Sequence, residues 1–369
     1  MSDKPCVLLV FGGVSSEHEI SCLTAGGVWG ALDPDRFEAV GVGISKAGDW
    51  LLADRATVRG YRVEGQRLPQ VDPNWPAAVV LRRRQSVWVA RLEGDRLVDQ
   101  RPVDVALCPM HGPFGEDGTI QGQFEMLGLP YVGAGVLSSA AAMDKSIMKR
   151  LLAEAGLPVG PWRTIEPGQW LRQPERCRQN LAALAYPLFV KPARGGSSIG
   201  ISRVDRPDQL DQAVETALQF DPKVIVEQGF TALREVECAV LVDRAQDRVE
   251  SSAPGEIEVQ AADRFYDFEA KYLPDQPLAL VVPARLDPAV AAEVRRLAEA
   301  ACRALEVEGL ARVDTFVTER GVFLNEINTM PGFTPTSLFP AMWAASGLDY
   351  PSLVTRLVEE ALSRPKGLR

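Results

Sequence analysis

The sequence predicts an α/β protein with three domains, and three observations support this prediction. The chain has 369 residues, which is too long for one compact core and suits two or three domains. Short apolar runs typical of buried strands alternate with helical stretches, which favours a parallel sheet in the amino-terminal part. The alternation starts again twice further along. We therefore expect an amino-terminal α/β domain at 1–142, a smaller α/β domain at 143–230 and a third domain at 231–369.

The first domain is expected to begin with a buried strand, the apolar run Val7–Phe11, which Gly12-Gly13 ends. Residues 50–102 read as irregular loops plus one hairpin with Gly94-Asp95 as its turn. The other expected elements of this domain are a helix from about Ser16 through Val28, strands near Phe37–Ile44, Val103–Cys108 and Pro130–Val132, a glycine-rich loop at Gly112–Gly118, and a helix at Ile120–Leu127.

The second domain should begin with a helix from Asp144 to Ala155, which Gly156 and Pro158 stop. Its remaining elements are strands Leu188–Val190, Gly200–Val204 and Val224–Glu227 and a helix at Asp208–Phe220. The third domain is expected to contain a strand at Glu235–Val242, a long helix at Pro288–Leu305 and a last helix at Tyr350–Leu362.

Composition excludes several classes of protein. Hydrophobic residues make up 46% and charged residues 24%, as in ordinary soluble enzymes. A net charge of −9 argues against a nucleic-acid partner. The six cysteines are scattered and form no Cys-x-x-Cys pair, so we expect buried free thiols rather than disulfides or a zinc site. No apolar run reaches membrane-spanning length, and the first one is too short for a signal peptide, which predicts a cytoplasmic protein without a membrane partner.

A metal site is predicted from the hairpin between residues 310 and 328. If its turn, Glu319-Arg320-Gly321, is centred on Arg320, Asp314 faces Glu326 and Arg312 faces Asn328. Side chains alternate between the faces of a strand, so these four side chains share one face. Two opposed carboxylates repel each other unless a cation lies between them, and oxygen ligands of this kind suit Mg²⁺.

Arg312, on the same face, can hold a phosphate oxygen or stabilise a developing anion. The alternative for this hairpin is an ordinary solvated face whose charges bind nothing. The carboxamide of Asn328 and the adjacent Pro331-Gly332 loop favour the metal site.

A phosphate-binding loop is predicted between two strands, in the segment from Lys191 to Gly200. Glycines let backbone N–H groups approach phosphates, Ser197 and Ser198 add hydroxyl donors, and Lys191 adds a positive charge. No Walker A sequence occurs in the chain. An ordinary flexible turn is the alternative, which the neighbouring metal site makes less attractive because both features fit a nucleotide.

The whole set of motifs resembles the D-alanine–D-alanine ligase family of the ATP-grasp superfamily. The resemblance covers essentially the whole chain and rests on Gly12–Ser21, His111-Gly112 with Gly115–Gly118, Met143-Asp144-Lys145, Lys191–Gly200, Phe265–Tyr272, Arg312-Val313-Asp314 and Asn325–Gly332. It implies an ATP-grasp fold in which nucleotide lies between the second and third domains. It also implies an enzyme that joins two D-alanine molecules through an acyl phosphate, releasing ADP and phosphate, for peptidoglycan precursors. ATP, two Mg²⁺ ions with Mn²⁺ as a substitute, and a homodimer are implied with it.

The resemblance also assigns the nucleotide and metal residues. Lys145, Lys191 and Lys271 would contact the phosphates of ATP, Glu227 would lie in the hinge near adenine, and Glu235 would hold the ribose. Ser197, Ser198 and Phe265 would complete the ATP site. Asp314, Glu326 and Asn328 would bind the two metal ions.

The substrate residues come from the same resemblance. Glu17 would bind the ammonium of the first D-alanine, with His111 nearby. Arg312 and the Gly332 amide would steady the acyl phosphate and the tetrahedral intermediate, while Ser337 and Leu338 would bind the carboxylate of the second D-alanine. A carboxylate at a helix start is also favoured by the helix dipole, an alternative that applies equally to Glu17 and Glu19.

Tyr272 is expected to decide the product. In the family a tyrosine here, hydrogen-bonded with Ser197 and Glu17, accompanies dipeptide formation, whereas phenylalanine accompanies depsipeptide formation with D-lactate. The alternative is that Tyr266 and Tyr272 only form a cleft wall. Residues 255–283 read as a long loop, which we expect to close over ATP and exclude water.

Three other functions are less consistent with the sequence. Another ATP-grasp ligase with a different acid and amine is the nearest, and Tyr272 and the Gly12–Ser21 segment argue against it. A catalytically silent nucleotide-binding protein is disfavoured by the complete set of lysines, metal ligands and Arg312. An NAD-dependent dehydrogenase lacks a fingerprint, because Gly133-Ala134-Gly135 has Ser138 in place of the third glycine and reads as a structural turn. The resemblance is not uniform: Gly195-Gly196 and His18 depart from common family residues, and residues 50–102 match poorly and received no role.

Overall fold

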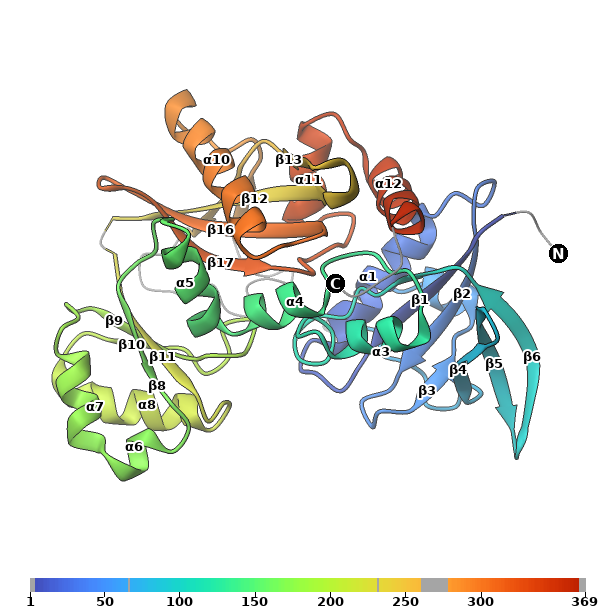
Figure 1. The fold of residues 1–369 in the computed structure, drawn as a ribbon, viewed down its shortest axis with the longest axis horizontal. Coiled ribbons are helices and arrows are strands. Elements are labelled where there is room, and N and C mark those ends of the chain that lie inside the picture. The colour runs from blue at the N-terminus through green and yellow to red at the C-terminus, as the bar shows by residue number, and fades with distance from the viewer. Residues whose placement is uncertain (1–3, 66, 231, 260–277, 365–369) are drawn as a thin grey trace.

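A computed structural model describes residues 4–65, 67–230, 232–259 and 278–364 of the chain (Figure 1). The amino-terminal part contains a four-stranded sheet. Its strand order is β3 (Trp50–Leu52), β2 (Glu38–Ile44), β1 (Cys6–Gly12) and β7 (Val105–Leu107), parallel except for β3. Every residue of β1 is buried, as expected for a parallel strand covered on both faces. The predicted strands near residues 7–11, 37–44 and 103–108 are confirmed. The helix α1 (His18–Ala31) begins two residues later than predicted.

A second sheet covers one face of the first. Strands β4 (Ala78–Arg83), β5 (Ser86–Glu93) and β6 (Arg96–Val103) form an antiparallel meander, and Gly94-Asp95 is the turn between β5 and β6, as predicted. The description of residues 50–102 as mostly irregular was wrong. Strand β3, helix α2 (Arg55–Arg59) and strand β4 were not predicted, because elements of three to six residues are too short to show a clear periodicity.

The remaining amino-terminal elements follow the glycine-rich loop. They are α3 (Thr119–Leu127) and α4 (Val136–Met143). The short strand predicted at 130–132 is reduced to a single bridge between Ala106 and Tyr131. Gly133-Ala134-Gly135 is a structural turn, as predicted, with Gly135 as the cap residue of α4.

The central part is a small antiparallel sheet with helices on one side (Figure 1). The strand order is β10 (Ser202–Val204), β9 (Leu188–Pro192), β11 (Val224–Gln228) and β8 (Trp162–Ile165). The helices on that side are α6 (Gln169–Arg172), α7 (Pro174–Leu181) and α8 (Leu210–Leu218), with a 3-10 turn at Pro207–Gln209. The helix α5 (Lys145–Glu154) instead packs against the carboxy-terminal part. The sheet, α6, α7 and α8 share their own hydrophobic core. Strands β9, β10 and β11 and helices α5 and α8 were predicted from the sequence, whereas β8, α6 and α7 were not.

The carboxy-terminal part is a six-stranded antiparallel sheet between helices. The order is β15 (Leu278–Val281), β14 (Gly255–Val259), β12 (Arg234–Asp243), β16 (Gly309–Thr318) and β17 (Gly321–Asn328), with β13 (Arg248–Ser251) also paired to β12. The helix α10 (Pro288–Ala304) covers one face, while α11 (Leu338–Ala345) and α12 (Tyr350–Ser363) cover the other. A 3-10 turn spans Arg244–Gln246.

Two features of this arrangement matter for the site. One hydrophobic core joins β1, α1 and β7 to α11, α12 and the adjacent face of the carboxy-terminal sheet. The ends of the predicted 255–283 loop are not loop but the paired strands β14 and β15, whereas residues 260–277 lie outside the described residues. The domain boundaries at residues 142 and 230 stay predictions.

Candidate active site

A cavity of about 460 Å³ lies where the three parts of the chain meet. Its walls come from α1 and the glycine-rich loop after β7, the loop after β9, the β16–β17 hairpin and the segment before α11. Many of the predicted site residues line it, namely Glu17, His111, Lys145, Ser197, Arg312, Glu326, Asn328, Gly332, Ser337 and Leu338. Segments far apart in sequence therefore meet at one site.

The β16–β17 hairpin has the predicted cross-strand pairs. Arg312 faces Asn328 and Asp314 faces Glu326, while Val313 and Ile327 are buried on the other face. The turn is one residue shorter than predicted, because Thr318 pairs with Gly321. A bulge beside Asp314 restores the predicted register at the polar end.

The polar face of this hairpin has excess carboxylate. Arg312 donates from Nε and Nη2 to the two oxygens of Asp314, at 2.7 Å each, and the Asn328 amide donates to Asp314 Oδ2 at 3.0 Å. Lys145 Nζ lies 3.2 Å from Glu326 Oε2. Within the described ranges no three acidic, histidine or cysteine side chains form a metal-binding group, so a cation here would need further oxygen ligands. The set of two carboxylates and a carboxamide fits Mg²⁺ that completes its shell with phosphates and water.

The loop after β9 is tied to the start of α5. Lys145 donates from its backbone N–H to Ala193 O at 3.0 Å and from Nζ to Gly195 O at 2.8 Å. Ser197 and Ser198 have φ of 51° and 59°, the left-handed region that non-glycine residues seldom adopt. This backbone turn carries the serines predicted to bind phosphate.

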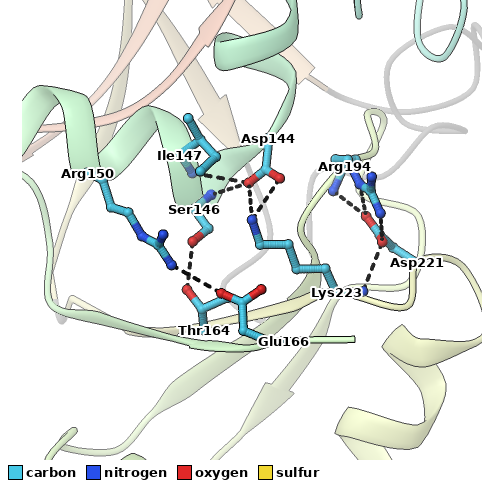
Figure 2. A network of polar contacts seen from close by, with 9 residues as sticks. All are labelled: Asp144, Ser146, Ile147, Arg150, Thr164, Glu166, Arg194, Asp221 and Lys223. Atoms are coloured by element: carbon cyan, nitrogen blue, oxygen red, sulfur yellow. Dashed lines mark hydrogen bonds and ion pairs between the residues drawn. The ribbon is translucent and has the colours of Figure 1, made fainter. Parts of the chain in front are cut away.

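A network of ion pairs fixes both segments on the central sheet (Figure 2). Asp144 accepts from the N–H groups of Ser146 and Ile147 at the start of α5 and from Lys223 Nζ at 2.8 Å. Arg194 forms a bidentate pair with buried Asp221, at 2.9 and 2.7 Å. The Arg194 and Lys223 N–H groups also donate to Asp221. The network thus determines where Lys145 and the loop lie.

A second ion cluster is buried beside the loop. The Glu227 carboxylate lies 2.9 Å from Lys149 Nζ and 2.5 Å from Lys191 Nζ. Burial alone would raise the pKa of Glu227, but Lys149 and then Lys191 outweigh it and hold that pKa at about 2. Burial opposes the charge of Lys191 too, yet Glu227 raises its pKa, so Lys191 and Glu227 are both ionised. The cluster has one more positive than negative charge, and Lys149 was missed by the sequence analysis although it lies one turn after Lys145.

Glu17 points into the cavity. It precedes α1, but its side chain makes no capping hydrogen bond and instead accepts from the Ser197 hydroxyl. A methyl group at Gly112 or Gly196 would come within 2.5 or 2.9 Å of Glu17 Oε2, so both glycines leave room for this carboxylate. Glu19, in contrast, pairs with Lys46 outside the cavity. The two glutamates that sequence alone did not separate therefore have different surroundings.

His111 and Glu116 complete this end of the cavity. The His111 Nδ1 atom donates to Met330 O at 2.9 Å, and burial lowers the pKa of the ring, which is therefore neutral. Glu116 accepts from the Gly112 N–H, and burial together with the charge of Glu17 raises its pKa to about 8. Glu116 lines the cavity but was assigned no role from sequence, although it belongs to the Gly115–Gly118 motif.

Another part of the cavity wall is formed by the segment before α11. Ser337 accepts from the Thr334 N–H at 3.0 Å and so closes a turn that presents Leu338. Arg59 and Tyr61 also line the cavity, although residues 50–102 had been given no role.

Other predicted site residues lie beside the cavity or outside the described residues. Lys191, Ser198, Glu227, Glu235 and Asp314 are not among the described residues that line it. Asp314 pairs with Arg312, which does line the cavity. Glu235 is on β12, two residues before Glu237, which also lines the cavity. Phe265, Lys271 and Tyr272 lie outside the described residues, so their predicted roles stay predictions.

Comparisons with known proteins identify the family of this chain. Residues 6–134 match the family described as "D-ala D-ala ligase N-terminus", and residues 151–359 match "D-ala D-ala ligase C-terminus". The chain belongs to the D-alanine–D-alanine ligase family. The predicted family and the ATP-grasp fold are thereby confirmed.

Similar proteins match this family member over nearly their full length. The D-alanine–D-alanine ligase of Kineococcus radiotolerans is 48% identical, covering 99% of both chains, and that of Pseudarthrobacter chlorophenolicus is 46% identical, covering 99% of this chain and 96% of the relative. The crystal structure of VanG D-Ala:D-Ser ligase from Enterococcus faecalis matches with a TM-score of 0.81 and 32% identity, covering 97% of this chain and 100% of that one. The D-alanine–D-alanine ligase of Coxiella burnetii matches with a TM-score of 0.79 and 30% identity, covering 98% and 95%.

All six cysteines are buried free thiols, as predicted. Over the described ranges, no helix combines the length and apolar character needed to span a membrane.

Proposed function

We propose that this protein joins two D-alanine molecules into D-alanyl-D-alanine, with hydrolysis of ATP to ADP and phosphate. The observation that carries the proposal is that one cavity joins a carboxylate for an ammonium group, a serine- and glycine-rich loop, and an arginine beside paired carboxylates. Family membership makes this the reaction to test first. The product would supply peptidoglycan precursors.

In the proposed site, the positive cluster and the adjacent loop bind the triphosphate. Lys145, Lys191, Ser197 and Ser198 would contact phosphate oxygens, since ammonium, hydroxyl and backbone N–H groups all donate to them. Glu227 and Glu235 would bind the adenine and the ribose. Phe265 and Lys271 keep their predicted roles in the ATP site.

Asp314, Glu326 and Asn328 would hold Mg²⁺ as two ions, with Mn²⁺ as a substitute. Their fit rests on the opposed carboxylates, whose charges are met in this structure by Arg312 and Lys145. Bound Mg²⁺ neutralises phosphate charge that would otherwise repel an incoming carboxylate.

The substrate end would orient the two amino acids. Glu17 would pair with the ammonium of the first D-alanine, beside neutral His111. Once the carboxylate of the first D-alanine has become an acyl phosphate, the amine of the second D-alanine attacks it. Arg312 and the Gly332 N–H would stabilise the negative oxygen that develops in this attack. Ser337 and Leu338 would bind the second carboxylate, and phosphate would leave.

Product choice would depend on the hydrogen bonds around Glu17. The Ser197 hydroxyl donates to Glu17, and both residues belong to this set. Tyr272 would complete it and favour an amine acceptor over D-lactate. We also propose that residues 255–283 close the site against water, with β14 and β15 as the two ends of the lid.

The protein is further proposed to act as a homodimer in the cytoplasm. Sedimentation equilibrium would test the dimer, and a single species of about 40 kDa would contradict it. Cell fractionation would test the location, and recovery with the membrane fraction would contradict it.

The decisive experiment measures phosphate release from ATP and Mg²⁺ with D-alanine, L-alanine, D-serine or D-lactate, and identifies each product by mass. Turnover with D-alanine alone, giving the dipeptide, is expected. D-serine or D-lactate added at equal concentration should leave the dipeptide as the main product. Turnover only with another acid and amine would refute the substrate while keeping the acyl-phosphate chemistry.

A further inference from the structure

Three carboxylates form a row across the carboxy-terminal sheet. Glu237 on β12 lies opposite Asp314 on β16, which lies opposite Glu326 on β17. Asp314 and Glu326 belong to the proposed metal site, whereas Glu237 has no role so far. Its side chain is only 6% exposed and lines the cavity. Burial of an unpaired carboxylate costs free energy, so the cation that pairs with Glu237 indicates the role of this residue.

That partner is Arg312. The Arg312 Nε atom lies 2.8 Å from Glu237 Oε2, while the same guanidinium pairs with Asp314. The residue opposite Arg312 on β12 is Ala239, whose small side chain leaves the arginine room to reach diagonally toward Glu237. On the other side of Glu237, β14 places Gly255, which has no side chain. The neighbouring strands therefore leave space for a Glu237–Arg312 pair.

Arg312 thus has two carboxylate partners, Asp314 and Glu237, with different proposed roles. Asp314 is a proposed metal ligand, and an oxygen that coordinates a cation has less negative charge to offer an arginine. Glu237 is outside the proposed ligand set. An arginine held by Asp314 alone would be free to change rotamer once that carboxylate turned toward a metal ion.

We propose that Glu237 is the positioning residue of Arg312, holding its guanidinium toward the cavity independently of Asp314. The inference rests on the proposed function, in which Arg312 stabilises the oxygen that becomes negative during amide formation. Glu237 touches no reacting atom. Its effect is on the orientation of a charge that must be in place before the amine attacks.

The test compares Glu237→Gln with Glu250→Gln. Glutamine keeps the size of glutamate and removes its charge. Glu250 is the matched control, since it forms a bidentate pair with Arg356 at 3.0 and 2.7 Å on β13 of the same sheet, away from the cavity lining. We would measure kcat, KM for ATP and D-alanine, and the Kd of a phosphinate dipeptide analogue, whose tetrahedral phosphorus resembles the intermediate.

Glu237→Gln should lower kcat about 10- to 100-fold, less than the roughly 10²- to 10³-fold typical for deleting an oxyanion donor. Analogue affinity should fall by a similar factor, whereas KM for ATP should change less than about twofold, because only groups that meet the developing charge are misplaced. Glu250→Gln should match wild type. In the double variant with Arg312→Lys, the two losses should combine less than multiplicatively, since one residue acts through the other.

Several outcomes would overturn the inference. These are an unchanged kcat in Glu237→Gln, a lower kcat with unchanged analogue affinity, or multiplicative losses in the double variant. A Glu237→Gln protein that fails to fold would overturn it too, because the carboxylate would then serve the fold. Failure of the proposed function would show separately, as a wild-type protein that makes no dipeptide. The variants would then be compared with the acid and amine that do support phosphate release.

Discussion

Two buried ion clusters in this protein have opposite charge balance. In the central part, the single carboxylate of Glu227 forms ion pairs with both Lys149 and Lys191. At the carboxy-terminal hairpin, the single guanidinium of Arg312 serves Asp314 and Glu237. A cluster with excess positive charge suits a phosphate, and a cluster with excess negative charge suits a metal ion or ammonium. In each cluster the protein neutralises only part of the charge. The charge that is left uncompensated indicates the sign of the charge on the ligand.

The largest effect should follow from removing charge at the acidic cluster. Asp314→Asn keeps a side chain of the same shape but removes one of the two opposed carboxylates and leaves Glu326. We expect a fall in kcat on the order of 10³-fold, comparable to losing an electrostatic catalytic group. The Mg²⁺ concentration needed for half-maximal activity should also rise. Steady-state kinetics over a Mg²⁺ titration checks both.

The matched control for Asp314→Asn is Asp243→Asn, a buried carboxylate on β12 whose partner is Arg248 and which does not line the cavity. Its kcat and Mg²⁺ dependence should equal those of wild type. A normal Mg²⁺ dependence in Asp314→Asn would contradict the proposed metal site.

At the basic cluster, Lys149→Met should weaken ATP binding without touching ATP. Glu227 would then depend on Lys191 alone and would compete with phosphate for it. We expect KM for ATP to rise about tenfold, the equivalent of 1.4 kcal/mol, with a smaller change in kcat. Arg150→Met, a half-exposed cation on the same helix that pairs with Glu166, provides the control. Equal KM values in the two variants would contradict the competition between Glu227 and phosphate.

The two pKa shifts give a prediction for stability. The pKa of Glu116 is raised to about 8, so its contribution is fully present below the unfolded-state value of 4.5 and is lost as pH rises through about 8. Glu116→Gln should therefore raise Tm relative to wild type at pH 9, by a few degrees, and change it less at pH 5. The pKa of Glu227, lowered to about 2, has the opposite sign, and its stabilisation is lost as pH falls from 4.5 toward 2.

Thermal unfolding without ligands from pH 2 to pH 9 checks this contrast. Glu227→Gln should lower Tm most at neutral pH and progressively less as pH falls below 4.5. Parallel pH curves for wild type and both variants would show that neither carboxylate titrates differently in the folded and unfolded states.

The smallest expected effect concerns the network that positions the loop. Arg194→Ala removes the bidentate pair with Asp221 and leaves the Lys223–Asp144 pair intact. Because Arg194 is half-exposed and the Ala193 contact with Lys145 remains, KM for ATP should rise only about two- to fivefold. Arg203→Ala, which breaks the surface pair with Asp205, should change nothing. An Arg194→Ala value of KM equal to that of Arg203→Ala would show that the network does not affect nucleotide binding.

The sequence was informative where one local pattern determined the answer. The apolar run of β1 and the register of Asp314 with Glu326 depend on residues close in sequence, and both were predicted. Glu237 was missed because its partners lie on a strand more than seventy residues later, a pairing that strand periodicity cannot supply. Arg59 was missed because residues 50–102 carry little pattern, and the cavity wall they form exists only after the parts of the chain have met.

The hydrophobic core shared by the first and last parts of the chain affects the order in which the protein can fold during synthesis. Leu353, Val354 and Leu357 of α12 pack in the same core as Val7 and Leu9 of β1. A fragment of residues 1–142 should bind an apolar dye that the full chain excludes, and no excess dye binding would contradict this. One face of the first sheet to leave the ribosome therefore stays exposed until the last helix has been made, so the amino-terminal strands depend on nearly the whole chain for protection from aggregation.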